Sequence, residues 1–163
     1  MPNSDEKFMH EAIKEAELAL REGNWPIGCV IVLNNKIIAR GHNQIYTTKN
    51  KLAHAEMNAI YRANDILYEN RCEATLYTTY EPCPMCFGAI ILSRIRRVVC
   101  GIDIDDSGAM YFRKNLPGLF KQDKFHVEFT TNVLADQCHD IFIQGKPTEK
   151  LIDNGILKKK SKK

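Results

Sequence analysis

The segment TLYTTYEPCPMCFGAIILSRIRRVVCG, residues 75–101, decides the fold of this chain. Its first part, Thr75–Thr79, is rich in β-branched and aromatic side chains and predicts a buried strand. A helix is expected to start near Cys83 and to end by Ser93, and Arg97–Gly101 predicts a further strand. Strands that alternate with helices are typical of α/β proteins, in which helices pack on the faces of one sheet.

The flanking sequence continues this alternation in both directions. Two β-like runs, residues 28–33 and 36–40, surround Asn34-Asn35, a pair that can take the positive φ angles of a tight hairpin turn. The remaining periodic segments predict helices at about 5–22, 54–67 and 133–144 and a strand at 125–130. We therefore expect an α/β fold, a three-layer α/β/α sandwich with a mixed five-stranded sheet. The longest irregular stretch is expected at about 102–124.

Length and charge favour one folded unit with a basic tail. The chain has 163 residues, with 23 Lys and Arg against 20 Asp and Glu, which gives a net charge of +3. Five of the lysines lie in residues 158–163, so residues 1–157 carry a net charge of −2. We expect a single domain over 1–157 and a disordered lysine-rich tail over 158–163, which adds only weak, salt-sensitive attraction to nucleic acid.

The sequence also predicts a cytoplasmic location. No apolar run approaches the ~18–20 residues of a membrane-spanning helix, and the N-terminus lacks the apolar region of a secretory signal. Of the six cysteines, Cys29 and Cys100 lie in apolar runs and are expected in the core.

Two short segments carry the chemistry: His54-Ala55-Glu56 and Pro82-Cys83-Pro84-Met85-Cys86. One imidazole and two thiolates, His54, Cys83 and Cys86, form a ligand set suited to zinc, and a catalytic zinc keeps its fourth position for water. Both cysteines lie at the start of a helix, where the partial positive charge favours thiolates. Glu56, two residues beyond His54, can point into the same cavity without binding the metal and can take a proton from that water.

Three other interpretations leave some of these residues without a role or require a further ligand. A purely structural zinc needs a fourth protein ligand, for which Cys72 or His42 can be proposed. A redox Cys-x-x-Cys leaves His54 and Glu56 without a role. A zinc-stabilised RNA-binding module needs no acid or base at Glu56.

His-x-Glu followed by Pro-Cys-x-x-Cys resembles the signature of the cytidine deaminase superfamily, over residues 8–145. The resemblance implies a cytidine deaminase-like fold, a single zinc ion, hydrolytic deamination and a homodimer. The apolar residues of 108–120 are compatible with a dimer interface or with covering the core.

The resemblance also implies a set of substrate-binding residues. Asn43, in Gly41-His42-Asn43, fits the asparagine that bonds the substrate base, although a local turn is an alternative role. Trp25 lies where the family lines its pocket, and a core or interface role is equally compatible. The expected substrate-binding residues are therefore Asn43, Trp25, Ala55 of the zinc motif, Asp106 and Asp153.

The substrate depends on which subfamily the chain resembles more. Bacterial tRNA adenosine deaminases are similar in the zinc motifs and in residues 93–101 and 134–138. They differ in two segments. They carry Gly-Ser-Leu where this chain has Gly108-Ala109-Met110. Their last helix usually ends in aromatic and arginine residues, which this chain lacks there. The net charge of −2 also lacks the basic footprint expected for an RNA partner.

Two groups that act on free bases offer other similarities. Small fungal cytosine deaminases share Arg40-Gly41-His42-Asn43 and a C-terminal pattern, Phe142-Ile143 to Asp153, which implies a lid over the pocket with Asp153 on the substrate amine. Small guanine deaminases share residues 81–90 and carry an acidic substrate residue near Asp106. We therefore expect a deaminase of a free nucleobase or nucleoside, of cytosine or guanine type, with a tRNA-specific adenosine deaminase as the alternative.

Overall fold

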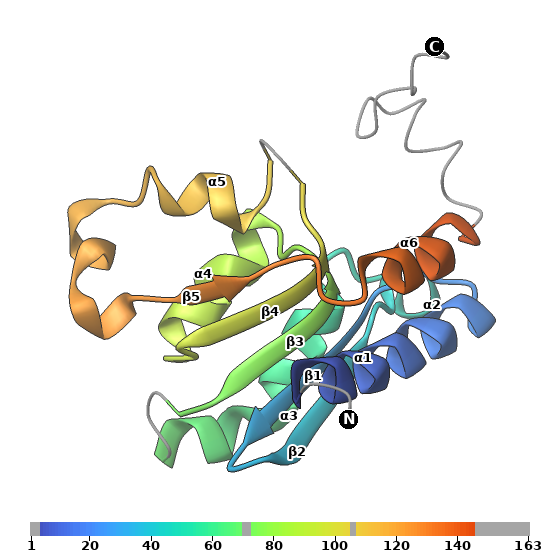
Figure 1. Ribbon diagram of the computed structural model, residues 1–163, viewed down its shortest axis with the longest axis horizontal. Coiled ribbons are helices and arrows are strands. Elements are labelled where there is room, and N and C mark those ends of the chain that lie inside the picture. Colours follow the sequence, from blue (N-terminus) through green and yellow to red (C-terminus); the bar gives the residue numbers. More distant parts are fainter. Residues whose placement is uncertain (1–3, 70–72, 105–106, 146–163) are drawn as a thin grey trace.

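A mixed sheet of five strands lies at the centre of the protein in the computed structural model (Figure 1). The structure describes residues 4–69, 73–104 and 107–145. The strands follow the spatial order β2-β1-β3-β4-β5; β1 is antiparallel to β2 and β3, whereas β3, β4 and β5 are parallel. Their bounds are β1 Gly28–Leu33, β2 Lys36–His42, β3 Thr75–Tyr80, β4 Arg97–Ile102 and β5 Glu128–Thr130.

Helices cover both faces of this sheet. One face carries α1 (Ser4–Arg21) and α6 (Ala135–Ile143), and the other carries α3 (Ala55–Glu69) and α4 (Pro84–Leu92). The shorter helical elements are α2 Ile45–Thr48, α5 Ala109–Arg113 and the 3₁₀ turns Gly118–Lys121 and Asp123–Phe125. The predicted three-layer sandwich is confirmed.

The strands fill two cores by strict alternation. In β1, Cys29 and Ile31 pack toward α3 and α4, whereas Val30 and Val32 pack toward α1 and α6. Successive side chains of a strand point to opposite faces, so an uncharged strand such as β1 supplies both cores at once. Cys29 is fully buried, as predicted, and so is Cys100 of β4.

The boundaries differ from the prediction where local geometry intervenes. Asn34 and Asn35 take φ angles of 49° and 61°, as expected for the hairpin turn. The predicted strand 125–130 shortens to β5 because Asp123–Phe125 forms a 3₁₀ turn. Leu134 adopts a left-handed conformation, so α6 begins only after it. The short helices α2 and α5 were not predicted, and α5 lies in the stretch expected to be irregular.

Strand β2 and helix α3 approach each other through a glycine. A Cβ atom at Gly41 would lie 2.3 Å from the carbonyl oxygen of Ala55 and 2.6 Å from the amide nitrogen of Ala59. Only a residue without a side chain permits this contact between two backbones. Gly41 thereby fixes the first turn of α3, which follows His54 directly.

In the part of the chain that the structure describes, no helix has the length and apolar character needed to cross a membrane. The predicted lysine-rich tail, residues 158–163, lies outside the described residues, so its disorder remains a prediction, as does the domain boundary at 157.

Helix α1 is tied to the sheet by a partly buried ion pair. Both carboxylate oxygens of Asp5 accept hydrogen bonds from Arg97, at 2.8 and 2.7 Å, and the Tyr77 hydroxyl donates to Asp5 at 3.0 Å. Arg97 also donates to the Thr130 hydroxyl at 3.1 Å. The hydrogen bonds from Arg97 lower the pKa of Asp5, and burial raises the pKa of Tyr77 to about 12. Four elements, α1, β3, β4 and β5, meet in this network.

We predict that Asp5→Asn lowers the free energy of unfolding by about 2 kcal/mol at neutral pH, because an ionised acceptor of Arg97 is lost. The pKa of Asp5 is lower in the folded than in the unfolded chain, so its contribution is present above about pH 4 and disappears as pH falls through the folded value. Urea unfolding across pH measures the difference, with Asp140→Asn, an exposed site on α6, as control. A deficit that persists unchanged in acid contradicts the assignment.

Candidate active site

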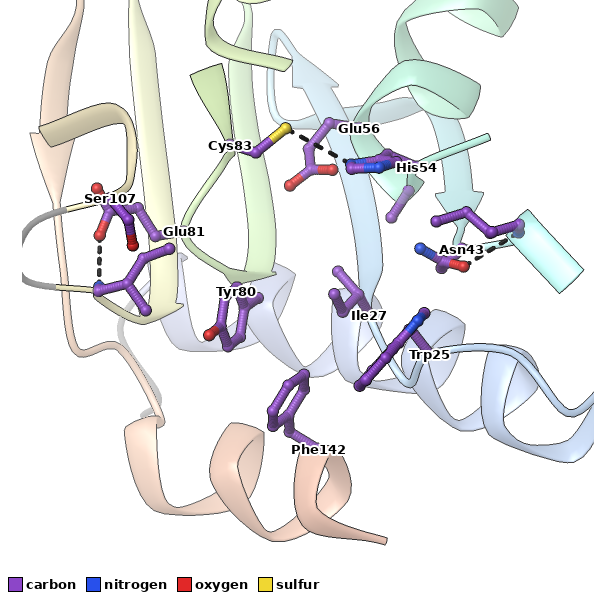
Figure 2. A pocket seen from close by; sticks show the side chains of 13 residues that line it. Trp25, Ile27, Asn43, His54, Glu56, Tyr80, Glu81, Cys83, Ser107 and Phe142 are labelled. Carbon is purple, nitrogen blue, oxygen red and sulfur yellow. Dashed lines mark hydrogen bonds between the residues drawn. The ribbon is translucent and has the colours of Figure 1, made fainter. Parts of the chain in front are cut away.

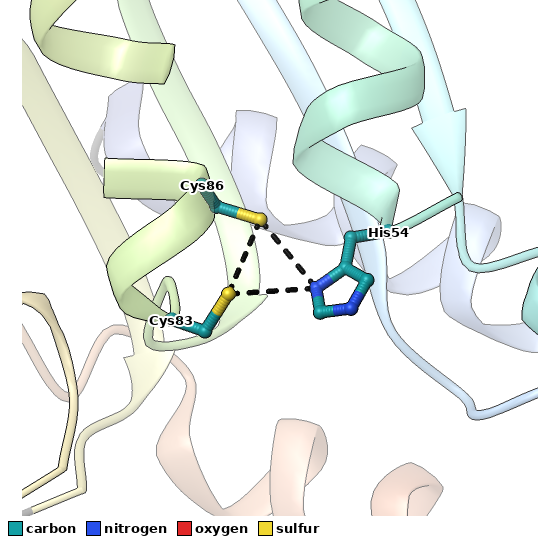
Figure 3. Close-up of side chains that lie close together, drawn as sticks. All are labelled: His54, Cys83 and Cys86. Carbon is teal, nitrogen blue, oxygen red and sulfur yellow. Dashed lines mark hydrogen bonds between the residues drawn. The ribbon is translucent and has the colours of Figure 1, made fainter. Parts of the chain in front are cut away.

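Three ligand atoms converge where the first turns of α3 and α4 meet (Figure 3). The Nδ1 atom of His54 lies 3.6 Å from the Cys83 sulfur and 3.5 Å from the Cys86 sulfur, and the two sulfurs are 3.6 Å apart. Tetrahedral zinc with ordinary bond lengths separates a nitrogen and a sulfur ligand by about 3.6 Å and two sulfurs by about 3.8 Å. The three residues therefore fit zinc at three corners of a tetrahedron.

The fourth corner has no protein ligand among the described residues, where only His54, Cys83 and Cys86 form such a group. His42, considered above as a fourth ligand, has both ring nitrogens on Glu15 and Glu22 instead. Cys72 lies outside the described residues. An N/S site with an open position is typical of catalytic zinc rather than structural zinc.

The pKa values of the two thiols shift in opposite directions. Hydrogen bonding with Cys86, and then with His54, lowers the pKa of Cys83 to about 4. The neighbouring Cys83 and burial raise the pKa of Cys86. A divalent cation bound between the two sulfurs would favour the thiolate form of both.

Glu56 lies beside this triangle without belonging to it. It is the second residue of α3 and is only 3% exposed. One carboxylate oxygen lies 3.4 Å from the Cys86 sulfur, and the other lies 3.2 Å from the Thr78 hydroxyl at the sheet. Burial raises the pKa of Glu56, so this carboxyl group holds a proton more readily than an exposed glutamate does.

A pocket of about 400 Å³ opens onto the ligand triangle (Figure 2). Of the residues expected at the site, His54, Ala55, Glu56, Cys83, Asn43 and Trp25 line it. Cys86 is fully buried and does not line the pocket. Asp106 and Asp153 lie outside the described residues. The pocket also includes residues that were not predicted as site residues: Ile27, Ile45, Tyr80, Glu81, Ile104, Ser107 and Phe142.

Aromatic side chains form one wall of the pocket. Phe142 of α6 stacks on Trp25, with ring centroids 6.0 Å apart, and on Tyr80, at 4.7 Å (Figure 2). Trp25 therefore packs within the protein and lines the pocket at the same time. Tyr80 follows a predicted strand directly, which is a usable signal because ligands gather at the carboxyl ends of parallel strands. Phe142 offers no such signal, since its position depends on how α6 packs.

The orientation of Asn43 follows from its neighbours. The Asn43 backbone donates to the carbonyl of Ile27 at 3.0 Å, and its side-chain oxygen accepts the Ile45 amide hydrogen at 3.1 Å. Because an N–H group must face the oxygen, the side-chain nitrogen points the other way, into the pocket (Figure 2). Asn43 therefore presents a hydrogen-bond donor to whatever occupies the pocket.

Glu81 holds a second wall in place. Its carboxylate is buried and accepts the backbone amide hydrogens of Ile104, at 2.6 Å, and Met110, at 2.7 Å. A Cβ atom at Gly108 would lie 2.4 Å from this carboxylate. The backbone can therefore approach Glu81 this closely only because residue 108 is a glycine. Glu81 thus ties the metal-binding segment to the part of the wall that includes Ile104 and Ser107.

The comparisons with known proteins agree with this geometry. Residues 2–102 match the cytidine and deoxycytidylate deaminase zinc-binding region. A tRNA-specific adenosine deaminase of Bacillus subtilis is 45% identical over 137 residues, covering 82% of this chain and 83% of its own, and one of Streptococcus pyogenes is 37% identical over 99% of this chain and 98% of its own. A solved chain from a study of A-to-I editing by tRNA:A34 deaminases superposes with a TM-score of 0.70 at 33% identity, covering 83% of this chain and 98% of that one.

This chain belongs to the cytidine and deoxycytidylate deaminase zinc-binding family. It is a zinc-dependent deaminase, a hydrolase that acts on C–N bonds of cyclic amidines, and His54, Cys83 and Cys86 form the zinc site typical of that family. The cytidine deaminase-like fold and the zinc cofactor predicted from the sequence are confirmed.

The expected free nucleobase or nucleoside substrate is wrong. Relatives that are 37–45% identical over 82–99% of this chain are tRNA-specific adenosine deaminases. The C-terminal lid that favoured a free base depends on Asp153 and its neighbours, which lie outside the described residues. The argument from net charge also fails, because a total of −2 says nothing about where the positive charges lie.

We predict that Glu81→Gln loosens one wall of the pocket and leaves zinc content unchanged. The variant keeps the size of the side chain but turns an amide NH₂ toward one of the two backbone N–H groups, so the amide of Ile104 or that of Met110 loses protection from hydrogen exchange. Exchange measured by NMR on the zinc-loaded protein tests this, with Glu73→Gln, exposed just before β3, as control. Unchanged protection at both amides contradicts the role given to Glu81.

Proposed function

We propose that this chain is a tRNA-specific adenosine deaminase that converts adenosine to inosine at the wobble position of the anticodon. The observation that carries the proposal is the 45% identity to the Bacillus subtilis tRNA-specific adenosine deaminase over 82% of this chain. The likeness to a solved chain from work on tRNA:A34 deaminases supports it.

The chemistry assigned to the site is hydrolytic. Zinc, when bound, acidifies water so that hydroxide is available near neutral pH. Glu56 accepts the proton of the attacking water and passes it to the adenine ring nitrogen next to the reacting carbon. The water oxygen bonds to the reacting carbon. Glu56 then takes the remaining proton of that oxygen and gives it to the exocyclic amine, the C–N bond breaks, ammonia leaves, and a carbonyl remains. The raised pKa of Glu56 suits a group that both takes and gives a proton near neutral pH.

The pocket walls suit a base that has left its stack. A deaminase acting on RNA takes the target base out of the loop into a pocket, where aromatic side chains and hydrogen bonds receive it. In this proposal Tyr80, Trp25 and Phe142 supply the aromatic surface, the Asn43 nitrogen donates to a ring nitrogen, and Ala55 lies against the base beside the zinc site. The proposed binding of the base assigns no role to Asp106 or Asp153.

Positive charge is available beside the pocket despite the negative total. The pocket residue Ile45 leads into an exposed segment, residues 46–52, which includes Tyr46, Lys49 and Lys51. Lysines of this kind neutralise phosphates, and an exposed tyrosine offers a surface for an unstacked base. We assign this segment to contact with the anticodon loop.

Two further sequence expectations belong to the proposal: a cytoplasmic location and a homodimer. Support for the dimer comes from exposed apolar side chains in the region 108–120, where Tyr111, Phe112 and Leu119 are 49%, 40% and 56% exposed. We expect light scattering to give the mass of two chains. A single-chain mass at micromolar concentrations contradicts the dimer without affecting the catalytic assignment.

The decisive experiment measures inosine in a tRNA that carries adenosine at the wobble position. We predict that the zinc-loaded protein forms inosine there and that Glu56→Gln lowers kcat by about 10²–10⁴-fold while zinc content stays the same, because only the proton carrier is removed.

Two controls give this experiment its meaning. The same tRNA with guanosine at that position must not react, and cytosine, guanine, adenine and their nucleosides must release little ammonia. Rapid release from one of those small molecules, with no inosine in tRNA, contradicts the proposed substrate.

A further inference from the structure

A buried histidine that plays no part in the zinc site is held between two carboxylates. The ring of His42 is 7% exposed. Its Nδ1 atom lies 3.0 Å from a carboxylate oxygen of Glu15, and its Nε2 atom lies 3.1 Å from one of Glu22. Glu15 belongs to α1, and Glu22 follows the end of that helix.

This arrangement fixes the protonation of the ring. Where both carboxylates are ionised they only accept hydrogen bonds, so both ring nitrogens carry a hydrogen and His42 is an imidazolium. A neutral ring would leave one carboxylate facing a nitrogen lone pair at hydrogen-bond distance. The hydrogen bond with Glu15, followed by that with Glu22, raises the pKa of His42.

The neighbouring charges complete the cluster. Arg40 of β2 reaches Glu15 at 3.7 Å and Glu11 of α1 at 2.6 Å. Arg62 of α3 donates to the backbone carbonyl of Arg40 at 2.7 Å. The groups that face His42 directly are therefore the two glutamates, and arginine charge lies behind Glu15, where it stabilises the carboxylate form.

His42 also connects the end of β2 to a residue of the pocket. It is the last residue of β2 and immediately precedes Asn43, whose nitrogen points into the pocket. The carbonyl oxygen of His42 accepts a hydrogen bond from the Asn58 side chain at 2.9 Å, and Asn58 lies one turn after the zinc ligand His54. The end of β2 is thus held by α1 through the His42 ring and by α3 through its backbone.

We propose that His42, held as an imidazolium between Glu15 and Glu22, is a positioning residue that fixes Asn43 for contact with the substrate base. The base itself is the one assigned under the proposed function, on which this part rests. Loss of the ring proton releases one of the two carboxylates, the end of β2 gains freedom, and Asn43 no longer meets the base in a fixed orientation.

Kinetics against pH separate this role from a purely structural one. For wild type, KM for the tRNA stays flat at neutral pH and rises in the alkaline range as His42 loses its proton. Glu22→Gln keeps a hydrogen-bond acceptor but removes its charge, so the rise in KM moves to lower pH. His42→Gln raises KM about tenfold at all pH values and abolishes the alkaline rise, with kcat within about twofold, since uniform binding is lost.

The matched control is Glu17→Gln, which makes the same charge change at an exposed position of α1. It must follow the wild-type curve, and every variant must retain wild-type zinc content. Coincident curves for wild type and Glu22→Gln overturn the proposal. So does an alkaline rise in KM that survives in His42→Gln.

A second measurement needs no substrate and covers a variant that folds poorly. Nitrogen-15 NMR on the zinc-loaded full chain follows the His42 ring nitrogens and the Asn43 side-chain amide through a pH titration. We expect both ring nitrogens to be protonated at neutral pH, the Asn43 amide to titrate together with them, and Glu22→Gln to move both transitions to lower pH. A neutral ring, or an Asn43 amide that does not follow it, overturns the proposal even if the substrate proves not to be tRNA.

Discussion

The convergence of one imidazole nitrogen and two sulfurs, each within 3.6 Å of the others, is the constraint on which the rest of the structure depends. The atoms come from the starts of two helices that flank β3, so both helices must begin at the same edge of the sheet. Gly41 permits the first of them to lie directly on β2. The parallel β3 and β4, connected by α4, place the second. The sheet thus serves chiefly to bring two helix N-termini together.

Three buried or partly buried glutamates near the site have two different roles. Glu56 is almost fully buried, and this burial raises its pKa. Glu81 accepts hydrogen bonds from two backbone amides, and Glu15 lies at hydrogen-bond distance from the His42 ring. The hydrogen bonds to Glu81 and Glu15 hold neighbouring segments in place, whereas the raised pKa of the buried Glu56 suits proton transfer. The difference lies in the neighbours, because the residue type is the same.

The sequence predicted the fold and the zinc ligands because both depend on short-range patterns. Cys83 and Cys86 are three residues apart at a helix start, which places their sulfurs on one side wherever the helix lies. The pocket walls were less predictable: Phe142 reaches Tyr80 only through the packing of α6, and Glu81 meets Ile104 and Met110 only after the chain has returned to it. His42 was considered as a possible metal ligand from its chemistry alone, and its two glutamate partners follow from the packing of α1 on β2. Contacts of this kind are set by tertiary structure and have no fixed spacing in sequence.

The same distinction explains why the substrate was predicted wrongly while the reaction was predicted correctly. The zinc triangle and Glu56 act only on the carbon that loses its amine and on the neighbouring ring nitrogen, so any cyclic amidine presents them with the same atoms. Discrimination among substrates must come from groups that touch the rest of the molecule, and in the proposed function these are the aromatic wall, the Asn43 donor and the exposed segment 46–52. A total charge averages over the whole surface, whereas an RNA loop contacts only the part around the pocket. The net charge of the chain therefore does not decide whether the proposed RNA partner can bind beside the pocket.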